Sequence, residues 1–119
     1  METVTLYRPV GQKELDLIQA ANFRVFPPRL AWQSIFYPVL SEDYAIQIAR
    51  DWNTRDSANG NVGYVTAFEV EAAYCSKFER KCVGRSDQQE LWVPAEELAE
   101  FNARIVGAIR VVREFRAGD

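Results

Sequence analysis

The chain of 119 residues contains no histidine. This absence excludes Ser-His-Asp and Cys-His nucleophilic systems, and it excludes metal sites that use imidazole ligands. It also removes the side chain that most often serves as a general base near neutral pH. Any chemistry that the protein performs must therefore use carboxylates, arginines, amides and hydroxyls.

Cysteine is almost as scarce, because Cys75 and Cys82 are the only two. Their spacing fits neither a CxxC redox pair nor a zinc knuckle, and no second pair completes a metal site. The polar stretch 53–61 loosely resembles a calcium loop, but Arg55 stands among the would-be ligands and no closing glutamate follows Gly60. We therefore expect two reduced, half-buried thiols and no metal.

Several other features are missing as well. No glycine-rich loop follows a predicted strand, which excludes nucleotide folds built on P-loop or dinucleotide fingerprints. No apolar run is long enough to span a bilayer, and residues 1–5 lack the basic start of a signal peptide. The net charge of −3 argues against nonspecific binding to duplex DNA or anionic membranes, which requires a positive field. We expect a cytoplasmic protein that binds neither nucleic acid nor membrane.

The residues that are present are those of a globular protein with a sizeable core. Hydrophobic residues make up 48% and aromatic residues 13%, which is too many for a disordered chain. The length suits one domain, which we place at residues 1–119. Three tryptophans in so short a chain favour either a wide core or a stacking surface.

The order of predicted elements indicates the fold class. Runs of β-branched and aromatic residues predict strands at residues 3–8, 23–26, 34–40, 62–71, 80–83, 89–93 and 105–115. Helical spacing of apolar residues predicts helices at residues 12–21, 42–52, 72–78 and 95–102. This order favours an α+β fold with a mixed, largely antiparallel sheet and flanking helices.

The helix predicted after Ser41 has the clearest signals. Ser41 is a suitable N-cap, and acidic residues follow it in the first turn, as the helix dipole prefers. Ala45, Ile48, Ala49 and Trp52 then recur at the spacing of one buried face. We expect all four side chains to pack against the sheet.

Three residues stand at notable places in this layout. Arg8 ends the first strand after an aromatic residue, Tyr37 lies in a central strand before the best helix, and Glu90 opens a late strand within a Gln-x-Glu sequence. An aromatic-arginine strand end, a Ser/Tyr-bearing central strand and a late Gln-x-Glu together resemble the ADP-ribosyltransferase fold. The resemblance implies a reduced version of that fold.

The chain also resembles a group of small bacterial proteins whose labels refer to ADP-ribosylation and J-type crystallin. Four phrases carry this resemblance: LYRPVG (6–11), FPPR (26–29), FYPVL (36–40) and ELWVPAEEL (90–98). It extends over nearly the whole chain. Together the two resemblances imply a protein that binds NAD or ADP-ribose.

The resemblance implies roles for particular residues. Loss of nicotinamide from NAD passes through an oxocarbenium-like cation, which a carboxylate beside the ribose stabilises. A guanidinium matches the pyrophosphate or the ribose in a bidentate manner. The resemblance therefore implies catalytic roles for Glu90 and for Gln88, which would orient an acceptor. It also implies that NAD is bound by Arg8, Tyr7, Tyr37 and Ser34. Ser34 belongs to a remnant of a Ser-Thr-Ser signature.

Each of these residues also has a plainer interpretation. Arg8 can be a strand-end arginine paired with a carboxylate, Glu90 a solvated strand residue, and Tyr37 and Trp92 half-buried core aromatics. The arginines interleaved along residues 104–116 fit a solvated face. The alternative function is a non-catalytic module that binds a protein partner through an exposed aromatic surface. Convergence of the arginine, the tyrosine and the glutamate on one cavity distinguishes the two hypotheses.

Overall fold

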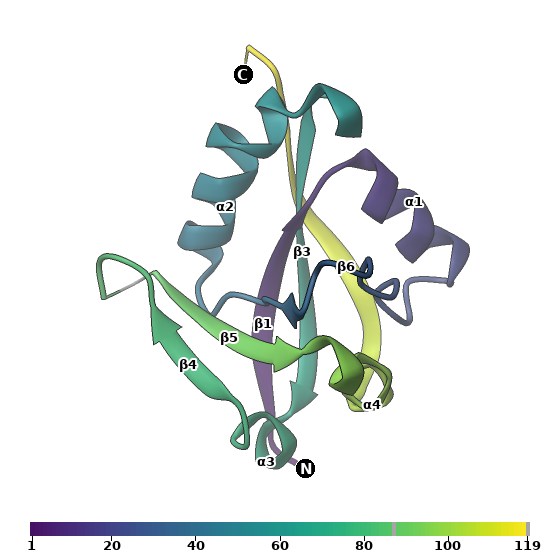
Figure 1. The fold of residues 1–119 in the computed structure, drawn as a ribbon, viewed down its shortest axis with the longest axis vertical. Coiled ribbons are helices and arrows are strands. Elements are labelled where there is room, and N and C mark those ends of the chain that lie inside the picture. Colours follow the sequence, from purple (N-terminus) through teal and green to yellow (C-terminus); the bar gives the residue numbers. More distant parts are fainter. Residues whose placement is uncertain (87, 119) are drawn as a thin grey trace.

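The computed structural model describes residues 1–86 and 88–118. In this part of the chain, the strands form two three-stranded sheets whose directions cross at a steep angle (Figure 1). The first sheet consists, in spatial order, of β1 (Thr3–Val10), β3 (Val62–Glu71) and β6 (Ile105–Arg116). The second consists of β2 (Ile35–Phe36), β5 (Gln89–Pro94) and β4 (Glu79–Cys82).

The α+β class is confirmed, but the single mixed sheet is wrong. Every described strand pair is antiparallel. A parallel pair needs a crossover that returns the chain to the same sheet. Here the helical connections after β1, β2 and β5 lead the chain from one sheet to the other instead.

The helices cover both faces of the first sheet. They are α1 (Gln12–Ala20), α2 (Glu42–Asp51), α3 (Ala72–Cys75) and α4 (Leu98–Ala103), with 3-10 turns η1 (Asn53–Arg55), η2 (Ser57–Asn59) and η3 (Ala95–Glu97). The second sheet, α1 and α4 share the main core with one face, while Ala45 and Ala49 of α2 pack with Val65 on the other. Because both faces are covered, residues 62–68 of the central strand β3 are all buried.

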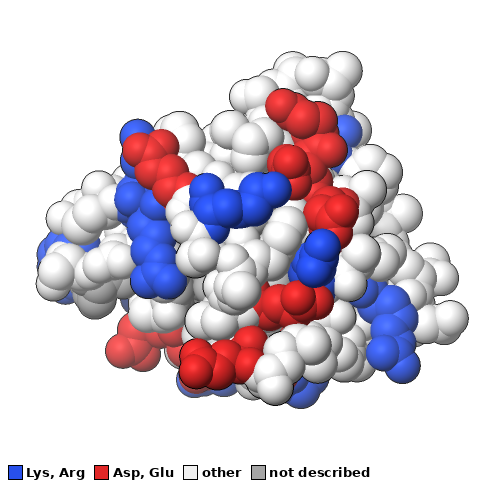
Figure 2. All heavy atoms as spheres, turned by 90° about the horizontal axis from the view of Figure 1, so that it is seen from below, with Lys and Arg blue, Asp and Glu red and all other residues white. Residues whose placement is uncertain are grey.

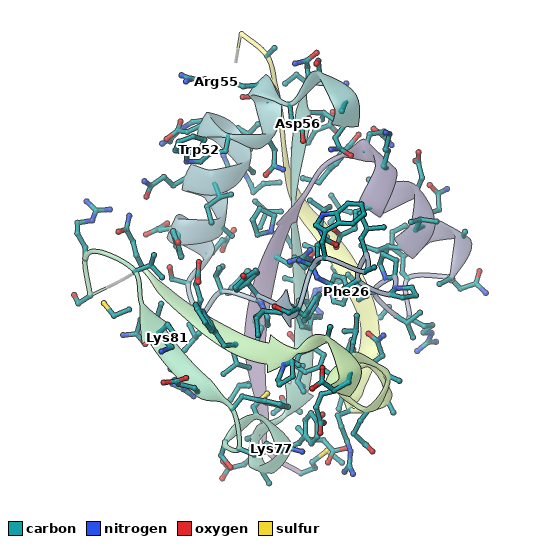
Figure 3. The ribbon with its side chains drawn as sticks, in the orientation of Figure 1. Phe26, Trp52, Arg55, Asp56, Lys77 and Lys81 are labelled. Atoms are coloured by element: carbon teal, nitrogen blue, oxygen red, sulfur yellow. The ribbon has the colours of Figure 1, made fainter. Side chains whose placement is uncertain are left out.

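The start of α2 is as predicted, but its end is not. The Ser41 hydroxyl accepts a hydrogen bond from the Tyr44 N–H at 3.1 Å, and Ala45 and Ala49 are fully buried. The prediction that Trp52 is buried is wrong, because its side chain is 68% exposed. Trp52 is the cap residue that follows the last residue of the helix, Asp51, and its side chain lies outside the core (Figure 3).

The strand predicted at 23–26 is also wrong. Asn22 and Phe23 both have a φ of 58°, so the chain makes a left-handed turn after α1 instead of extending. Phe26 then inserts its ring between Phe36 and Phe68, at centroid distances of 5.2 and 4.8 Å (Figure 3). This segment is therefore a loop that is anchored in the core by one aromatic side chain.

The run 34–40 forms less strand than its composition predicts, yet it connects the two sheets. Only Ile35–Phe36 pairs as a strand, with β5. Val39 makes isolated bridges to Tyr7 of β1 and to Glu90 of β5. The Val39 N–H donates to the Tyr7 carbonyl at 2.7 Å, and the Tyr7 N–H donates to the Val39 carbonyl at 3.0 Å. The bonds to β5 come from the two neighbours of Val39: the Leu40 N–H donates to the Gln89 carbonyl and the Pro38 carbonyl accepts from the Leu91 N–H. Residues 38–40 thus connect the edge of the first sheet to the second.

Acidic and basic side chains are intermingled on the face that Figure 2 shows from below. Arg110 pairs with Glu69, and Arg116 pairs with Glu114, so the arginines of β6 contribute to a solvated face with mixed charge. Within the described residues, no helix combines the length and the apolar character that a membrane crossing requires.

Candidate functional site

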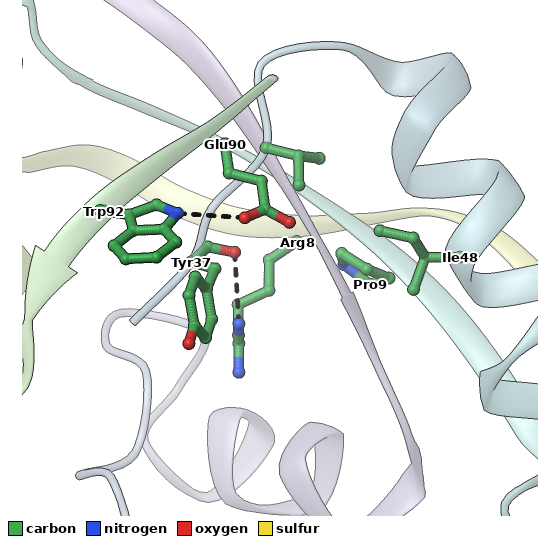
Figure 4. A pocket seen from close by; sticks show the side chains of 7 residues that line it. Arg8, Pro9, Tyr37, Ile48, Glu90 and Trp92 are labelled. Carbon is green, nitrogen blue, oxygen red and sulfur yellow. Dashed lines mark hydrogen bonds between the residues drawn. The ribbon is translucent and has the colours of Figure 1, made fainter. Parts of the chain in front are cut away.

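A hollow of about 430 Å³ opens where the two sheets meet (Figure 4). Its described lining consists of Arg8, Pro9, Tyr37, Val39, Ile48, Glu90 and Trp92. The arginine, the tyrosine and the glutamate that we expected to share a cavity therefore line the same one. They come from β1, from the segment after β2, and from β5.

The bridges of Val39 explain this convergence. Tyr7 pairs with Val39, which places the next residue, Arg8, beside the junction. Glu90 pairs with Val39 from the other side, and Tyr37 lies two residues before it. Three distant stretches of sequence thus meet because one valine pairs with both sheets.

The Arg8 guanidinium is held in place by a carboxylate, a carbonyl and an aromatic ring. Its Nε and Nη2 donate to the two carboxylate oxygens of Glu14 at 2.6 and 3.0 Å. Its Nη1 makes a long 3.5 Å contact with the Tyr37 carbonyl, and the group lies 4.7 Å from the centre of the Phe36 ring. The ion pair therefore occupies one edge of the guanidinium. The edge between Nη1 and Nη2 has N–H donors that this ion pair does not use, in a side chain that is 10% exposed.

The Glu90 carboxylate is oriented by two donors. The Tyr44 hydroxyl donates to Oε2 and the Trp92 indole N–H donates to Oε1, both at 3.1 Å (Figure 4 draws the second). Each oxygen accepts one of these bonds and so retains capacity for another. An oriented carboxylate of this kind can hold a ligand hydroxyl or face a developing positive charge.

Two aromatic rings form one wall of the hollow. Tyr37 and Trp92 meet edge to face with their centroids 5.7 Å apart. Tyr37 is 37% exposed and Trp92 is half-buried, so both rings keep area for a ligand. The Lys81 ammonium lies 5.0 Å from the centre of the Trp92 ring. This wall suits a flat heterocycle.

Three predicted residues lie elsewhere and are not among the described residues that line the hollow. Tyr7 contributes its backbone to the junction, and its ring packs on the α2 side of the first sheet. Ser34 is exposed, and its carbonyl accepts from the Ala95 N–H at 2.9 Å. The Gln88 side chain donates to Gln47 at 3.1 Å.

No protein-family model, curated protein or solved structure matches this chain.

Several residues of the site were missed from the sequence. Glu14 follows Arg8 by six positions, and a turn from strand to helix lies between them. Neither helical nor strand spacing therefore predicts that the two side chains meet. Tyr44 lies in the first turn of α2, where its only sequence signal was the cap at Ser41. Trp92 was predicted only as a core or half-buried aromatic, and it is half-buried; its hydrogen bond to Glu90 depends on the side-chain direction along β5, which the sequence does not show.

The two cysteines lie in different surroundings. Cys75 is buried and Cys82 is exposed, so neither is half-buried as expected, and both are free thiols. Burial raises the pKa of Cys75 to about 11, which disfavours the reactive thiolate. Within residues 1–86 and 88–118, no acidic or cysteine side chains are grouped to hold a metal ion.

Tyr44 is expected to make stability depend on pH in the alkaline range. Burial first, and then the charge of Glu90 and the hydrogen bond to it, raise the pKa of Tyr44 from 10.0 to about 12. The folded state therefore keeps a proton that the unfolded chain loses between these values. The resulting stabilisation is complete below pH 10 and is lost as the pH rises toward 12.

Urea unfolding of the wild type and of Tyr44→Phe, measured at a series of alkaline pH values, checks this expectation. The free energy of unfolding should fall more steeply with pH in the wild type. Because other groups titrate equally in both proteins, the difference between the curves isolates Tyr44. Parallel curves would show that this hydroxyl has an ordinary pKa.

Proposed function

We propose that the hollow binds NAD or ADP-ribose and that the protein is a minimal ADP-ribosyltransferase. On this proposal, the two crossed sheets are the reduced ADP-ribosyltransferase core that the sequence resembles. The observation that carries the proposal is the meeting of Arg8, Tyr37 and Glu90 in one hollow. Its volume of about 430 Å³ lies within the range of small-molecule sites.

Each group has a chemical task in this proposal. The open edge of Arg8 binds a phosphate of the ligand in a bidentate manner. The rings of Tyr37 and Trp92 hold the nicotinamide. The carboxylate of Glu90, oriented by Tyr44, accepts a hydrogen bond from a ribose hydroxyl and faces the anomeric carbon.

The reaction breaks the bond between the ribose and nicotinamide. The bonding electron pair leaves with the pyridine nitrogen, so nicotinamide departs as a neutral molecule and the ribose becomes an oxocarbenium-like cation. The negative charge of Glu90 stabilises that cation more than it stabilises the ground state. A nucleophilic acceptor then forms the new bond to the anomeric carbon and gives up its proton.

Titration with NAD and with ADP-ribose tests the binding step. We expect the wild-type melting temperature to rise with the concentration of either ligand, because a ligand that binds only the folded state stabilises it. An unchanged melting temperature at millimolar ligand would end the proposal.

Glu90→Gln tests the chemical step. The amide keeps the size of the side chain but removes the charge that favours the cation. We expect binding within about threefold of the wild type and nicotinamide release, followed by chromatography, to fall by about a hundredfold or more. Glu96→Gln, at an exposed glutamate outside the hollow, is the matched control. Undiminished release from Glu90→Gln would assign the chemistry to another group.

A non-catalytic module that binds a protein partner is the second candidate. The observation in its favour is the exposure of two tryptophans, Trp32 at 79% and Trp52 at 68%. Large exposed aromatic side chains are enriched at protein interfaces. This candidate becomes the better explanation if neither nucleotide stabilises the wild type.

A further inference from the structure

A second hollow, of about 400 Å³, lies between α1 and residues 27–33. Its lining combines apolar residues, among them Leu17, Pro28 and Leu30, with polar ones, among them Lys13, Glu14 and Arg29. The two leucines are 55% and 54% exposed, so they present apolar surface to whatever enters. A hollow of this mixed composition suits a ligand that has both an apolar and a charged part.

The two hollows meet at one ion pair. Arg8 lines the first hollow, and its partner Glu14 lines the second. The side chains of the pair are only 10% and 23% exposed, so the pair forms a partly buried partition between two open spaces. A ligand with two halves could therefore occupy both spaces and cross the partition between them.

A second guanidinium lies close to this partition. The Nε of Arg29 donates to the Ile35 carbonyl at 3.0 Å, which holds the side chain in place. Burial, and then the neighbouring positive charge of Arg8, lower the pKa of Arg29. Arg29 and Glu14 line the second hollow together, and Glu14 is paired with Arg8, so both guanidiniums lie near this carboxylate.

This arrangement leaves positive charge uncompensated. Arg8 engages both oxygens of Glu14, and the charge of Glu14 also acts on Arg29, so one carboxylate faces two guanidiniums. Two like charges close together are unfavourable unless enough negative charge faces them. An anion with oxygens for two guanidiniums, such as a diphosphate, would balance this charge.

We propose that the second hollow binds the adenosine half of the ligand, with the diphosphate lying between Arg8 and Arg29. The inference rests on the proposed function and deepens it. It commits the ligand to a nucleotide with two halves joined by a diphosphate. The purine packs against Leu17 and Leu30, and the diphosphate takes the place next to the Arg8–Glu14 pair.

Calorimetric titration of the full chain with four ligands tests the proposal. NAD and ADP-ribose contain the diphosphate and the adenosine, AMP contains only the adenosine half with one phosphate, and nicotinamide riboside contains neither. Arg29→Gln removes the second guanidinium, and Leu17→Glu places a negative charge in the purine hollow. Arg24→Gln makes the same substitution, and Gln19→Glu adds the same negative charge, at exposed neighbours outside the described linings.

We expect Arg29→Gln and Leu17→Glu each to weaken NAD, ADP-ribose and AMP by about tenfold or more, the effect of losing one charge-assisted hydrogen bond or of an unfavourable charge. Nicotinamide riboside should bind both variants as it binds the wild type. The two control variants should match the wild type with every ligand. Melting temperatures identify a variant that has lost its fold, and the other variant then decides.

The outcomes separate this inference from the proposed function. If NAD and nicotinamide riboside bind the wild type but neither variant weakens NAD, the second hollow is not part of the site and only this inference is overturned. If AMP binds and the variants weaken it while nicotinamide riboside does not bind, the second hollow is supported and the role of the first is overturned. If no ligand binds the wild type, both are overturned.

Discussion

Arg8→Met is expected to remove measurable NAD binding and to lower the free energy of unfolding by about 2 kcal/mol. Methionine keeps much of the buried aliphatic volume but has no charge. The Glu14 carboxylate, whose side chain is 23% exposed, then loses its bidentate partner. A partly buried charge without a partner is destabilising, and the ligand phosphate loses its donor. Urea unfolding and calorimetry measure the two effects.

The double variant Arg8→Met with Glu14→Gln separates the two roles of the arginine. It removes the orphaned carboxylate, so most of the lost stability should return. Binding should not return, because the guanidinium is still missing. A double variant that binds NAD as the wild type does would show that Arg8 only supports the fold.

Gly63→Ala is expected to cost the most stability of any single change considered, about 3 kcal/mol. Gly63 lies in β3 where α2 crosses it, and an added β-carbon would overlap the backbone carbonyl of Ala49. Because a backbone cannot rotate away as a side chain can, the whole helix must shift. Urea unfolding at neutral pH measures the loss.

Gly107→Ala is the control for this change. Gly107 has a φ of 84°, but an added β-carbon would meet no atom within 4 Å. Gly107→Ala should therefore lower the free energy of unfolding only through backbone strain, by about 1 kcal/mol. Equal losses at the two glycines would show that the contact of α2 with β3 is less tight than described. A shift of α2 would also move Tyr44 and Ile48, so Gly63→Ala should weaken the site as well.

The correctly predicted features are those that depend on residues close together in the sequence. The strand at 62–71, the cap at Ser41 and the inward-facing Leu98 and Phe101 all follow from residues a few positions apart. Helical spacing correctly predicted the burial of Ala45 and Ala49, but it wrongly predicted the burial of Trp52 at the end of the same helix. The strand expected at 23–26 failed because a turn at Asn22 and Phe23 decided the backbone there.

The sequence by itself determined which side chains can take part in chemistry: carboxylates and guanidiniums, but no histidine. It also determined the α+β class, because most helices and strands follow from residues that are close together in the sequence. We expected Arg8, Tyr37 and Glu90 to lie close together because of a resemblance. The spacing of residues along the sequence does not predict this contact. Only the tertiary structure decided that Val39 joins two sheets and that Glu14 is the partner of Arg8. Such contacts depend on where separate elements pack, and packing is a property of the whole chain.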